Sequence, residues 1–298
     1  MKKIIAVLLV IITVFVFASC KKEENPADIG FGDDASVTDG TSGNEDRYAV
    51  PEDDGDASDE NNDKIMISLP EGYTLVRFAW KLEDNGICSA DDFIKEAQTG
   101  DFSEFALVNE EPDDENICFK LEGYLYPCTI EIDKQNDTPR TIIEKLLEAG
   151  ESYITEDMRA KAKSMGYSWH EILTVASIVE KEAFLEDQRA QIASVLYNRL
   201  DAGMQIQCDV TIKYVTGVIE EIYPEKVDTL KYFYNTYRCS GLPAGPICNP
   251  GIESIRAALN PPQTDYLFFA IQTEEPYDSL FAATYEEHLE NCKKLGIN

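Results

Sequence analysis

The sequence of 298 residues is poor in basic side chains and holds only two histidines. Its 26 Lys and Arg are outnumbered by 56 Asp and Glu, which gives a formal charge of −30 at pH 7. Nucleic acids are bound by clusters of Lys and Arg, and no such cluster stands out, so no nucleic-acid partner is expected. His170 and His288 lie far apart, and neither an HExxH nor a CxxC pattern is present. The sequence therefore predicts no metal site and no cofactor.

The apolar segment at the N-terminus is short for a membrane-spanning helix. Ile4 to Phe17 is a run of 14 residues that follows Met1-Lys2-Lys3 and precedes Ala18-Ser19, which is typical of a secretory signal (residues 1–20). Phe17-Ala18-Ser19-Cys20 resembles the bacterial lipobox, with Phe where Leu is usual. We expect a lipidated Cys20, or alternatively an uncleaved signal anchor, to hold the protein at the extracytoplasmic face of the cell membrane.

The cysteines are scattered without the spacing of metal ligands. Setting Cys20 aside leaves seven of the eight, and an odd number cannot all pair within one chain. Cys118 with Cys128, and Cys239 with Cys248, are possible disulfides. The alternative is that these residues are small buried thiols.

Residues 21–64 form an acidic segment with 15 acidic and 4 basic residues. Such a composition cannot bury enough apolar surface to offset the entropy of ordering, so a disordered linker is predicted. Repulsion between its charges would extend it. The linker would act either as a spacer between membrane and cell wall or as a solubilising tail, and the composition favours neither.

Residues 65–130 are expected to form a small α+β module. Ile65 to Leu69 has strand character, and Thr74 is a good N-cap for a helix that stops at Asn85-Gly86. Ser89 caps a second helix over residues 90–98. The predicted order is strand, helix, helix, strand.

Residues 131–298 are predicted to form a mixed α+β domain with a helical core. Thr138-Pro139 starts one helix, and Ser168 with Glu171 forms a capping box before a helix over residues 172–184. A second capping box, Thr284 with Glu287, opens the last helix. Residues 266–271 read as a buried strand.

The helix over residues 172–184 carries the candidate acid. At 100° per residue, Glu180 lies roughly 65° and Glu182 roughly 95° from the mean direction of its apolar side chains. Glu180 is predicted to lose hydration, which disfavours the anion and suits an acid catalyst of glycoside cleavage. The alternative for Glu180 is a paired surface residue. Glu182 is interpreted as solvated or paired with a nearby base.

Aromatic and amide side chains are frequent after Gly203, together with rigid turns at residues 241–246 and 249–251. This combination suits an open cleft that binds sugars, although each tyrosine alone could equally belong to the core. The candidates from this region are Gln207, Asp209, Tyr234, Asn235 and Tyr237.

Several segments, in this order, resemble the endolytic murein transglycosylases of the MltG/YceG-like family. They are LEGYLYP (121–127), LTVASIVEKE (173–182), YNRL (197–200), YNTY (234–237), GLP (241–243), GPI (245–247), NPG (249–251) and DYLFF (265–269). Asn198 and Asn249, which lie in these blocks, complete the predicted substrate-binding set. Residues 206–211 depart from the family's LQSDPT, with Cys208 in place of a hydroxyl residue and Val210 in place of proline.

The resemblance implies a LysM-like subdomain over residues 65–130 and a catalytic domain in which Glu180 is the acid/base residue. It also implies peptidoglycan as substrate, cleaved between N-acetylmuramic acid and N-acetylglucosamine, and partners in the cell-wall synthesis machinery. We expect Glu180 to protonate the glycosidic oxygen and then deprotonate the muramic 6-hydroxyl, which gives a 1,6-anhydro end. The alternatives are a water-using muramidase that pairs Glu180 with Asp209, and a non-catalytic lipoprotein that binds the wall.

Overall fold

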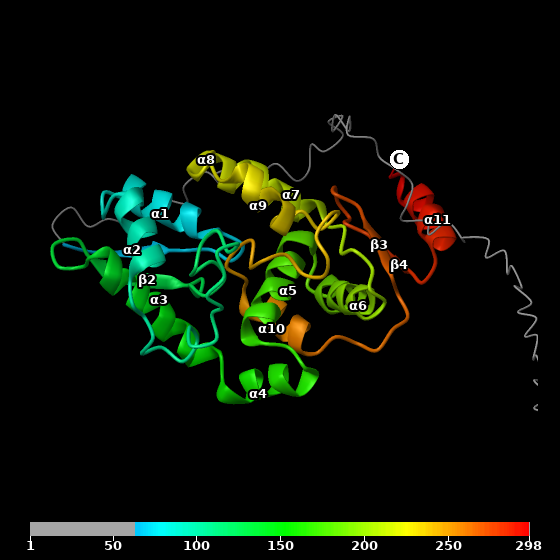
Figure 1. Ribbon diagram of the computed structural model, residues 1–298, viewed down its shortest axis with the longest axis horizontal. Helices are drawn as coiled ribbons and strands as arrows, with labels where there is room; N and C mark the ends of the chain where they lie inside the picture. The colour runs from blue at the N-terminus through cyan, green and yellow to red at the C-terminus, as the bar shows by residue number, and fades with distance from the viewer. Residues whose placement is uncertain (1–62, 298) are drawn as a thin grey trace, which may run out of the picture. The chain divides into compact units, whose positions relative to one another are not determined.

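Two antiparallel strand pairs and a larger set of helices make up residues 63–297, the part of the chain that the computed structural model describes (Figure 1). The predicted mixed α+β class is confirmed. The predictions for the signal, for lipidation of Cys20 and for the acidic linker up to residue 62 lie outside the described residues. Within residues 63–297, no helix combines the length and the apolar character needed to cross a membrane.

The first module has the predicted order of elements: β1 (Lys64–Ser68), α1 (Leu75–Asp84), α2 (Ala90–Thr99) and β2 (Thr129–Asp133). β1 and β2 pair antiparallel, with Ile65 opposite Ile132 and Ile67 opposite Ile130. Both strands alternate buried and exposed side chains, so these four isoleucines face the core. The LysM-like form of this module stays a prediction.

The predicted N-caps explain where the helices begin. The Thr74 hydroxyl accepts a hydrogen bond from the Arg77 amide at 3.2 Å, and Ser89 accepts one from the Asp92 amide at 3.1 Å. Ser168 and Glu171 form both arms of the predicted capping box. Because these bonds satisfy donors that a helix start leaves open, short polar residues fix the starts that the sequence indicated.

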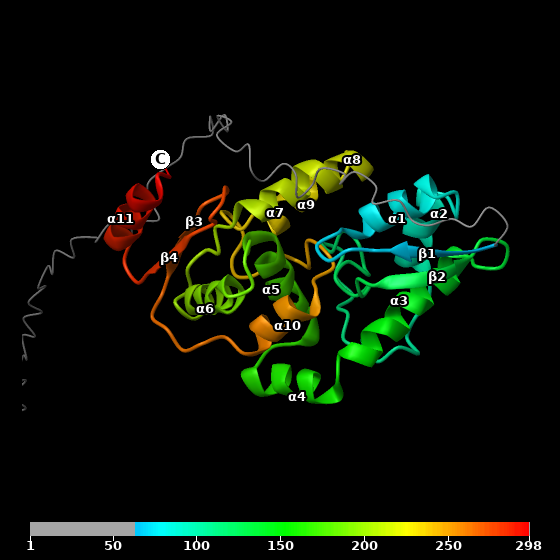
Figure 2. The same cartoon turned by 180° about the vertical axis from the view of Figure 1, so that it is seen from behind.

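A group of helices forms the centre of the fold. It consists of α3 (Pro139–Tyr153), α4 (Glu156–Met165), α5 (Trp169–Glu182), α6 (Gln188–Asp201) and α10 (Ile252–Leu259). α5 packs against α4, α6, α10 and the short helix Asp209–Tyr214, and it is buried on nearly all sides. Figures 1 and 2 both show α5 beside α6 and α10, which also contact each other. Its polar residues bond locally, as Thr174 does to the His170 carbonyl at 2.8 Å.

The C-terminal part adds α7 (Asp209–Tyr214), the π-helix η3 (Val215–Ile219), α8 (Glu220–Ile222), α9 (Val227–Tyr234), the hairpin β3 (Phe268–Ile271) and β4 (Ser279–Ala282), and α11 (Tyr285–Leu295). α11 packs on both strands of the hairpin, and β3 also contacts α6 (Figure 2). The strand predicted at residues 266–271 exists, but its side chains are mostly half-buried because it belongs to a two-stranded sheet.

One hydrophobic core runs through both predicted modules, from Ile65 to Leu259. The division into modules at residues 130 and 131 stays a prediction. Cys118 is not bonded to Cys128, and Cys239 is not bonded to Cys248, so the two possible disulfides are not formed. Four cysteines are buried, which agrees with the alternative of small buried thiols: Cys118, Cys208, Cys239 and Cys248.

The loop of residues 121–127 packs closely against Pro246 at a glycine, Gly123. Gly123 has a φ of +85°, and a Cβ atom there would lie 2.6 Å from two atoms of the Pro246 ring. Gly86 has a similar φ of +66° but has open space around it. The two glycines therefore share a backbone requirement and differ in packing.

We expect Gly123→Ala to destabilise the protein more than Gly86→Ala. The left-handed backbone costs each alanine about 1 kcal/mol, and the overlap with Pro246 adds about 2 kcal/mol at position 123 alone. Urea unfolding of both variants measures the difference. Equal losses of unfolding free energy would show that the contact with Pro246 relaxes without cost.

Candidate active site

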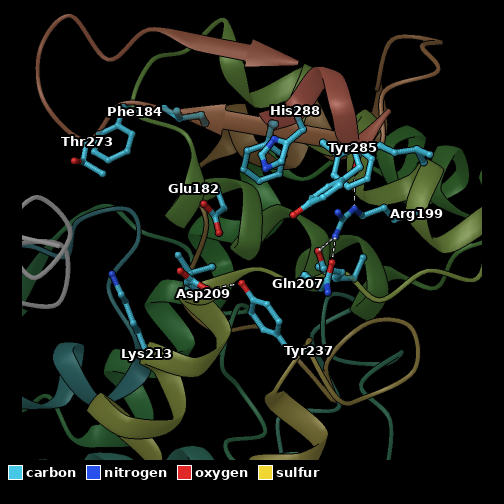
Figure 3. Close-up of a pocket in the computed structure, with 16 residues that line it drawn as sticks. Glu182, Phe184, Arg199, Gln207, Asp209, Lys213, Tyr237, Thr273, Tyr285 and His288 are labelled. Atoms are coloured by element: carbon cyan, nitrogen blue, oxygen red, sulfur yellow. Dashed lines mark hydrogen bonds between the residues drawn. The ribbon is translucent and has the colours of Figure 1, made fainter. Parts of the chain in front are cut away.

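A pocket of about 380 Å³ opens where the C-terminal end of α5 meets the start of α7, the β3–β4 hairpin and α11 (Figure 3). The hairpin and α11 supply an apolar and aromatic wall. α5, α6, α7 and the loop before α7 supply polar and charged groups. The polar and aromatic lining residues include Glu182, Arg199, Gln207, Asp209, Lys213, Tyr237, Phe268, Tyr285 and His288.

Glu182 is the last residue of α5, and its carboxylate points into the pocket toward Asp209 and Tyr237 (Figure 3). Beside it lies Cys208, the residue that departs from the family's hydroxyl. The pKa of the Cys208 thiol is raised, first by burial and then by the negative charge of Glu182, with which it shares a hydrogen bond. The side chain of Glu182 is half-buried. Its hydrogen bond with Cys208 orients the carboxylate, which faces the pocket.

Asp209 and Tyr237 form a hydrogen-bonded pair on the same wall. The Tyr237 hydroxyl donates to Oδ1 of Asp209 at 2.6 Å. Burial, and then the bond to Asp209, raise the pKa of Tyr237, so the phenol stays a proton donor at neutral pH. The side chain of Asn235 accepts a bond from the Tyr237 amide at 3.0 Å and so fixes the turn that presents this tyrosine.

Gln207 lies in the pocket with a backbone φ of +56°, which is uncommon for a residue with a side chain. Its carbonyl Oε1 accepts a hydrogen bond from Nη1 of Arg199 at 3.1 Å. The backbone N–H of Gln207 donates to the Thr236 carbonyl at 3.1 Å. Gln207, Asp209 and Tyr237 are thus three predicted site residues that the fold brings together.

Glu180 does not line this pocket. Its Oε2 accepts hydrogen bonds from the Ser254 hydroxyl at 2.6 Å and from the Gly251 amide at 3.2 Å. A second carboxylate, Glu71, lies close by, and its pKa is raised by burial and then by the charge of Glu180. Glu180 and Glu182 have different surroundings because residues two apart on a helix point in nearly opposite directions.

Three further candidates for substrate binding form hydrogen bonds within the protein: Tyr234, Asn198 and Asn249. Tyr234 is buried, and its hydroxyl accepts from the Cys118 amide at 3.1 Å. Nδ2 of Asn198 donates to the carbonyls of Thr264 and Tyr266 and so ties α6 to the segment before β3.

Asn249 is fully buried and joins three segments. Its Oδ1 accepts from the amides of Gly123 and Leu125 at 2.9 and 3.1 Å, and its Nδ2 donates to the Tyr73 carbonyl at 3.1 Å. The amide is committed to these bonds and does not face the pocket.

A buried carboxylate supports the helix that carries Asp209. Glu122 is 1% exposed; its Oε1 accepts from the Leu75 amide at 2.9 Å and its Oε2 from the Tyr214 hydroxyl at 3.1 Å. Leu75 begins α1 and Tyr214 ends α7. Burial raises the pKa of Glu122 to about 8, although these bonds and the charge of Lys181 oppose the shift.

Reasoning from the sequence missed Glu182, Arg199, Tyr285 and His288 as pocket residues. Glu182 and Arg199 stand in the segments 173–182 and 197–200 that carried the family resemblance, which was the available signal. Burial, and then the charge of Arg199, lower the pKa of His288, so that its ring is neutral at pH 7. Within the described part of the chain, no three His, Cys, Asp or Glu side chains gather as a metal site requires.

Comparisons with known proteins agree with this architecture. The profile of the YceG-like family matches residues 53–294. An endolytic murein transglycosylase of Bacillus subtilis (strain 168) is 34% identical over 231 residues, which cover 75% of this chain and 63% of the relative. One of Streptococcus pneumoniae (D39) is 29% identical over 253 residues, covering 78% and 45%.

A crystal structure of a YceG-like protein from Listeria monocytogenes is similar in fold. The TM-score is 0.65 at 33% identity, over 76% of this chain and 75% of that one. The chain spans less than two thirds of the length of the Bacillus relative (63%) and less than half of the Streptococcus relative (45%).

Protonation of the buried Glu122 gives the fold a pH dependence. The folded state holds a proton that the unfolded chain releases between about pH 4.5 and pH 8, so this contribution to stability is lost as the pH rises through that window. We expect Glu122→Gln, which keeps an acceptor for the Leu75 amide, to remove this loss of stability with rising pH. The unfolding free energy of the wild type should fall relative to the variant by up to about 1.4 kcal/mol per pH unit. Parallel urea-unfolding profiles from pH 5 to pH 8.5 would contradict this.

Proposed function

The chain belongs to the YceG-like family, and from that premise we propose that it cleaves glycosidic bonds inside the glycan strands of peptidoglycan, as a lytic transglycosylase. Two relatives that carry the name endolytic murein transglycosylase support the substrate and the reaction. The observation that carries the proposal is the pocket, where a half-buried carboxylate, a second carboxylate and a phenol face a space of about 380 Å³ beside an aromatic wall.

We assign the acid/base role to Glu182 and not to Glu180, the residue that the sequence favoured. Glu182 faces the pocket, whereas the carboxylate of Glu180 bonds to Ser254 and Gly251. An acid catalyst must lie within hydrogen-bond reach of the proton it transfers, so position in the pocket takes precedence over hydrophobic periodicity.

In the proposed mechanism, protonated Glu182 donates its proton to the glycosidic oxygen as the bond from the anomeric carbon to that oxygen breaks. The resulting carboxylate takes the proton of the muramic 6-hydroxyl, whose oxygen attacks the anomeric carbon of the same sugar. One C–O bond breaks, one forms, and Glu182 ends protonated. No water is consumed, so one carboxylate suffices, and the Asp209–Tyr237 pair is left to bind and orient the sugar.

The presence of Asp209 in the same pocket supports a second candidate, a water-using muramidase. Hydrolases need two carboxyl groups at a separation that fixes the stereochemical outcome. The alternative first considered paired Asp209 with Glu180. Since Glu182 lines the pocket with Asp209, the pair for this candidate is Glu182 and Asp209.

The matched variants Glu182→Gln and Glu180→Gln test the assignment in the full chain. We expect Glu182→Gln to lower the rate of strand cleavage about 100- to 10,000-fold, because it removes the transferable proton. Glu180→Gln keeps an acceptor oxygen for Ser254 and Gly251 and should change the rate little. Digestion of purified sacculi, with the product masses read by mass spectrometry, measures both.

The product masses also separate the alternatives. Anhydro ends indicate transglycosylation, and reducing ends indicate the muramidase with Glu182 and Asp209. If Glu180→Gln alone abolished cleavage, the assignment from the sequence would be right and the one from the pocket wrong. Binding of sacculi without any cleavage would indicate a wall-binding lipoprotein.

We further propose that lipidated Cys20 holds the protein at the extracytoplasmic face of the membrane, where the cell-wall synthesis machinery would be its partner. The signal and lipobox pattern of residues 1–20 support this. We expect Cys20→Ser to move the protein from the membrane fraction to the soluble fraction. Retention of Cys20→Ser in the membrane would indicate an uncleaved signal anchor instead.

A further inference from the structure

Arg199 places a buried positive charge on the wall of the pocket. It is 7% exposed, although it lines the pocket from α6. Its guanidinium lies 5.0 Å from the centre of the Phe268 ring. Among residues 63–297 no carboxylate forms an ion pair with it, which is unusual because a buried charge is costly unless it is paired.

Hydrogen bonds fix one side of this guanidinium. Nε donates to the Leu267 carbonyl at 2.6 Å, while Nη1 donates to the carbonyls of Gln205 and Ile206 and to Oε1 of Gln207, at 3.0, 2.8 and 3.1 Å. All four acceptors are uncharged. They hold the planar group rigidly between β3 and the loop before α7, but they leave its charge unneutralised.

The remaining amino group, Nη2, donates to no group in the described part of the chain. It is also not among the side-chain atoms that are sealed from solvent without a partner. Since Arg199 lines the pocket, Nη2, with two N–H donors, is the part of its guanidinium that remains available to a ligand there.

The left-handed backbone of Gln207 belongs to the same arrangement. A residue with a side chain holds this conformation at a cost, and such strain gathers at ligand-binding positions. The bond from Nη1 of Arg199 keeps Gln207 in place. Figure 3 shows Arg199 and Gln207 on one side of the pocket and Asp209 with Lys213 on the other.

We propose that Nη2 of Arg199 binds a carboxylate oxygen carried by the glycan strand, so that the pocket selects strands with a negatively charged substituent. This inference rests on the proposed function, because it takes a strand of peptidoglycan as the ligand. The carboxylate belongs either to a free lactyl group of muramic acid or to the stem peptide. A desolvated guanidinium favours either one over a neutral oxygen, because charge-assisted hydrogen bonds are about twice as strong as neutral ones.

The test measures binding to the full-length Glu182→Gln protein by calorimetry. The probes are a muramic-acid-containing tetrasaccharide with free lactyl carboxylates, its neutral methyl amide, and a tetrasaccharide whose lactyl groups bear stem peptides with free carboxylates. At least one of the two charged probes should bind about tenfold or more tightly than the methyl amide. The probe that does so identifies the source of the carboxylate.

Two further variants locate the group responsible. Arg199→Lys in the Glu182→Gln background keeps a positive charge but loses the fork, and it should erase the preference. Lys213→Gln, which removes the other basic side chain of the pocket, should leave the preference intact. If Arg199→Lys fails to fold, the comparison of charged and neutral probes in the parent protein still decides.

Equal affinity for the charged and neutral probes would overturn the proposal, and so would a preference that Lys213→Gln removes and Arg199→Lys keeps. Wild-type protein from the same preparation is assayed on sacculi in parallel. Cleavage without a charge preference overturns the Arg199 site alone. Absence of both cleavage and binding overturns the proposed function as well.

Discussion

The burial of α5 on nearly all sides is the constraint on which the rest of the structure depends. A helix inside a core cannot leave a charged side chain near its end in water, so each such residue must find partners on its own side. Lys181 donates to the Gly72 carbonyl at 3.3 Å, and Glu180 bonds to Ser254 and Gly251. Glu182 is turned about 200° from Glu180, and the pocket lies on that side.

The same constraint explains how far the sequence could lead. The helix starts were predictable because N-caps and capping boxes are local chemistry, and Thr74, Ser89 and Ser168 form the bonds that their spacing indicated. The orientation of the two glutamates was not predictable. A helical wheel assumes one apolar face and one solvent-exposed face. α5 has no solvent-exposed face, so the wheel cannot show that Glu180 and Glu182 have different surroundings.

Contacts with residues distant in the sequence also decide where Asn249 and Arg199 point. Asn249 looked like a cleft amide because its turn is rich in proline and glycine, but three of its bonds reach segments more than 100 residues away. Arg199 gave no signal beyond its motif, because its role depends on β3 passing beside α6. Neither contact has a periodicity or a spacing that the sequence alone displays.

The segments that resemble the family therefore contain residues of two kinds: some form a buried network, and others line the pocket. Glu122 and Asn249 meet in a buried network, with Nδ2 of Asn249 donating to Oε1 of Glu122 at 3.3 Å, and this network fixes α1 and α7. Glu182, Arg199 and Tyr237 stand in similar motifs but line the pocket. The two kinds are connected through α7, since Tyr214 at one end bonds to Glu122 and Asp209 at the other bonds to Tyr237. A motif match identifies the family, and the side to which each residue points assigns its chemistry.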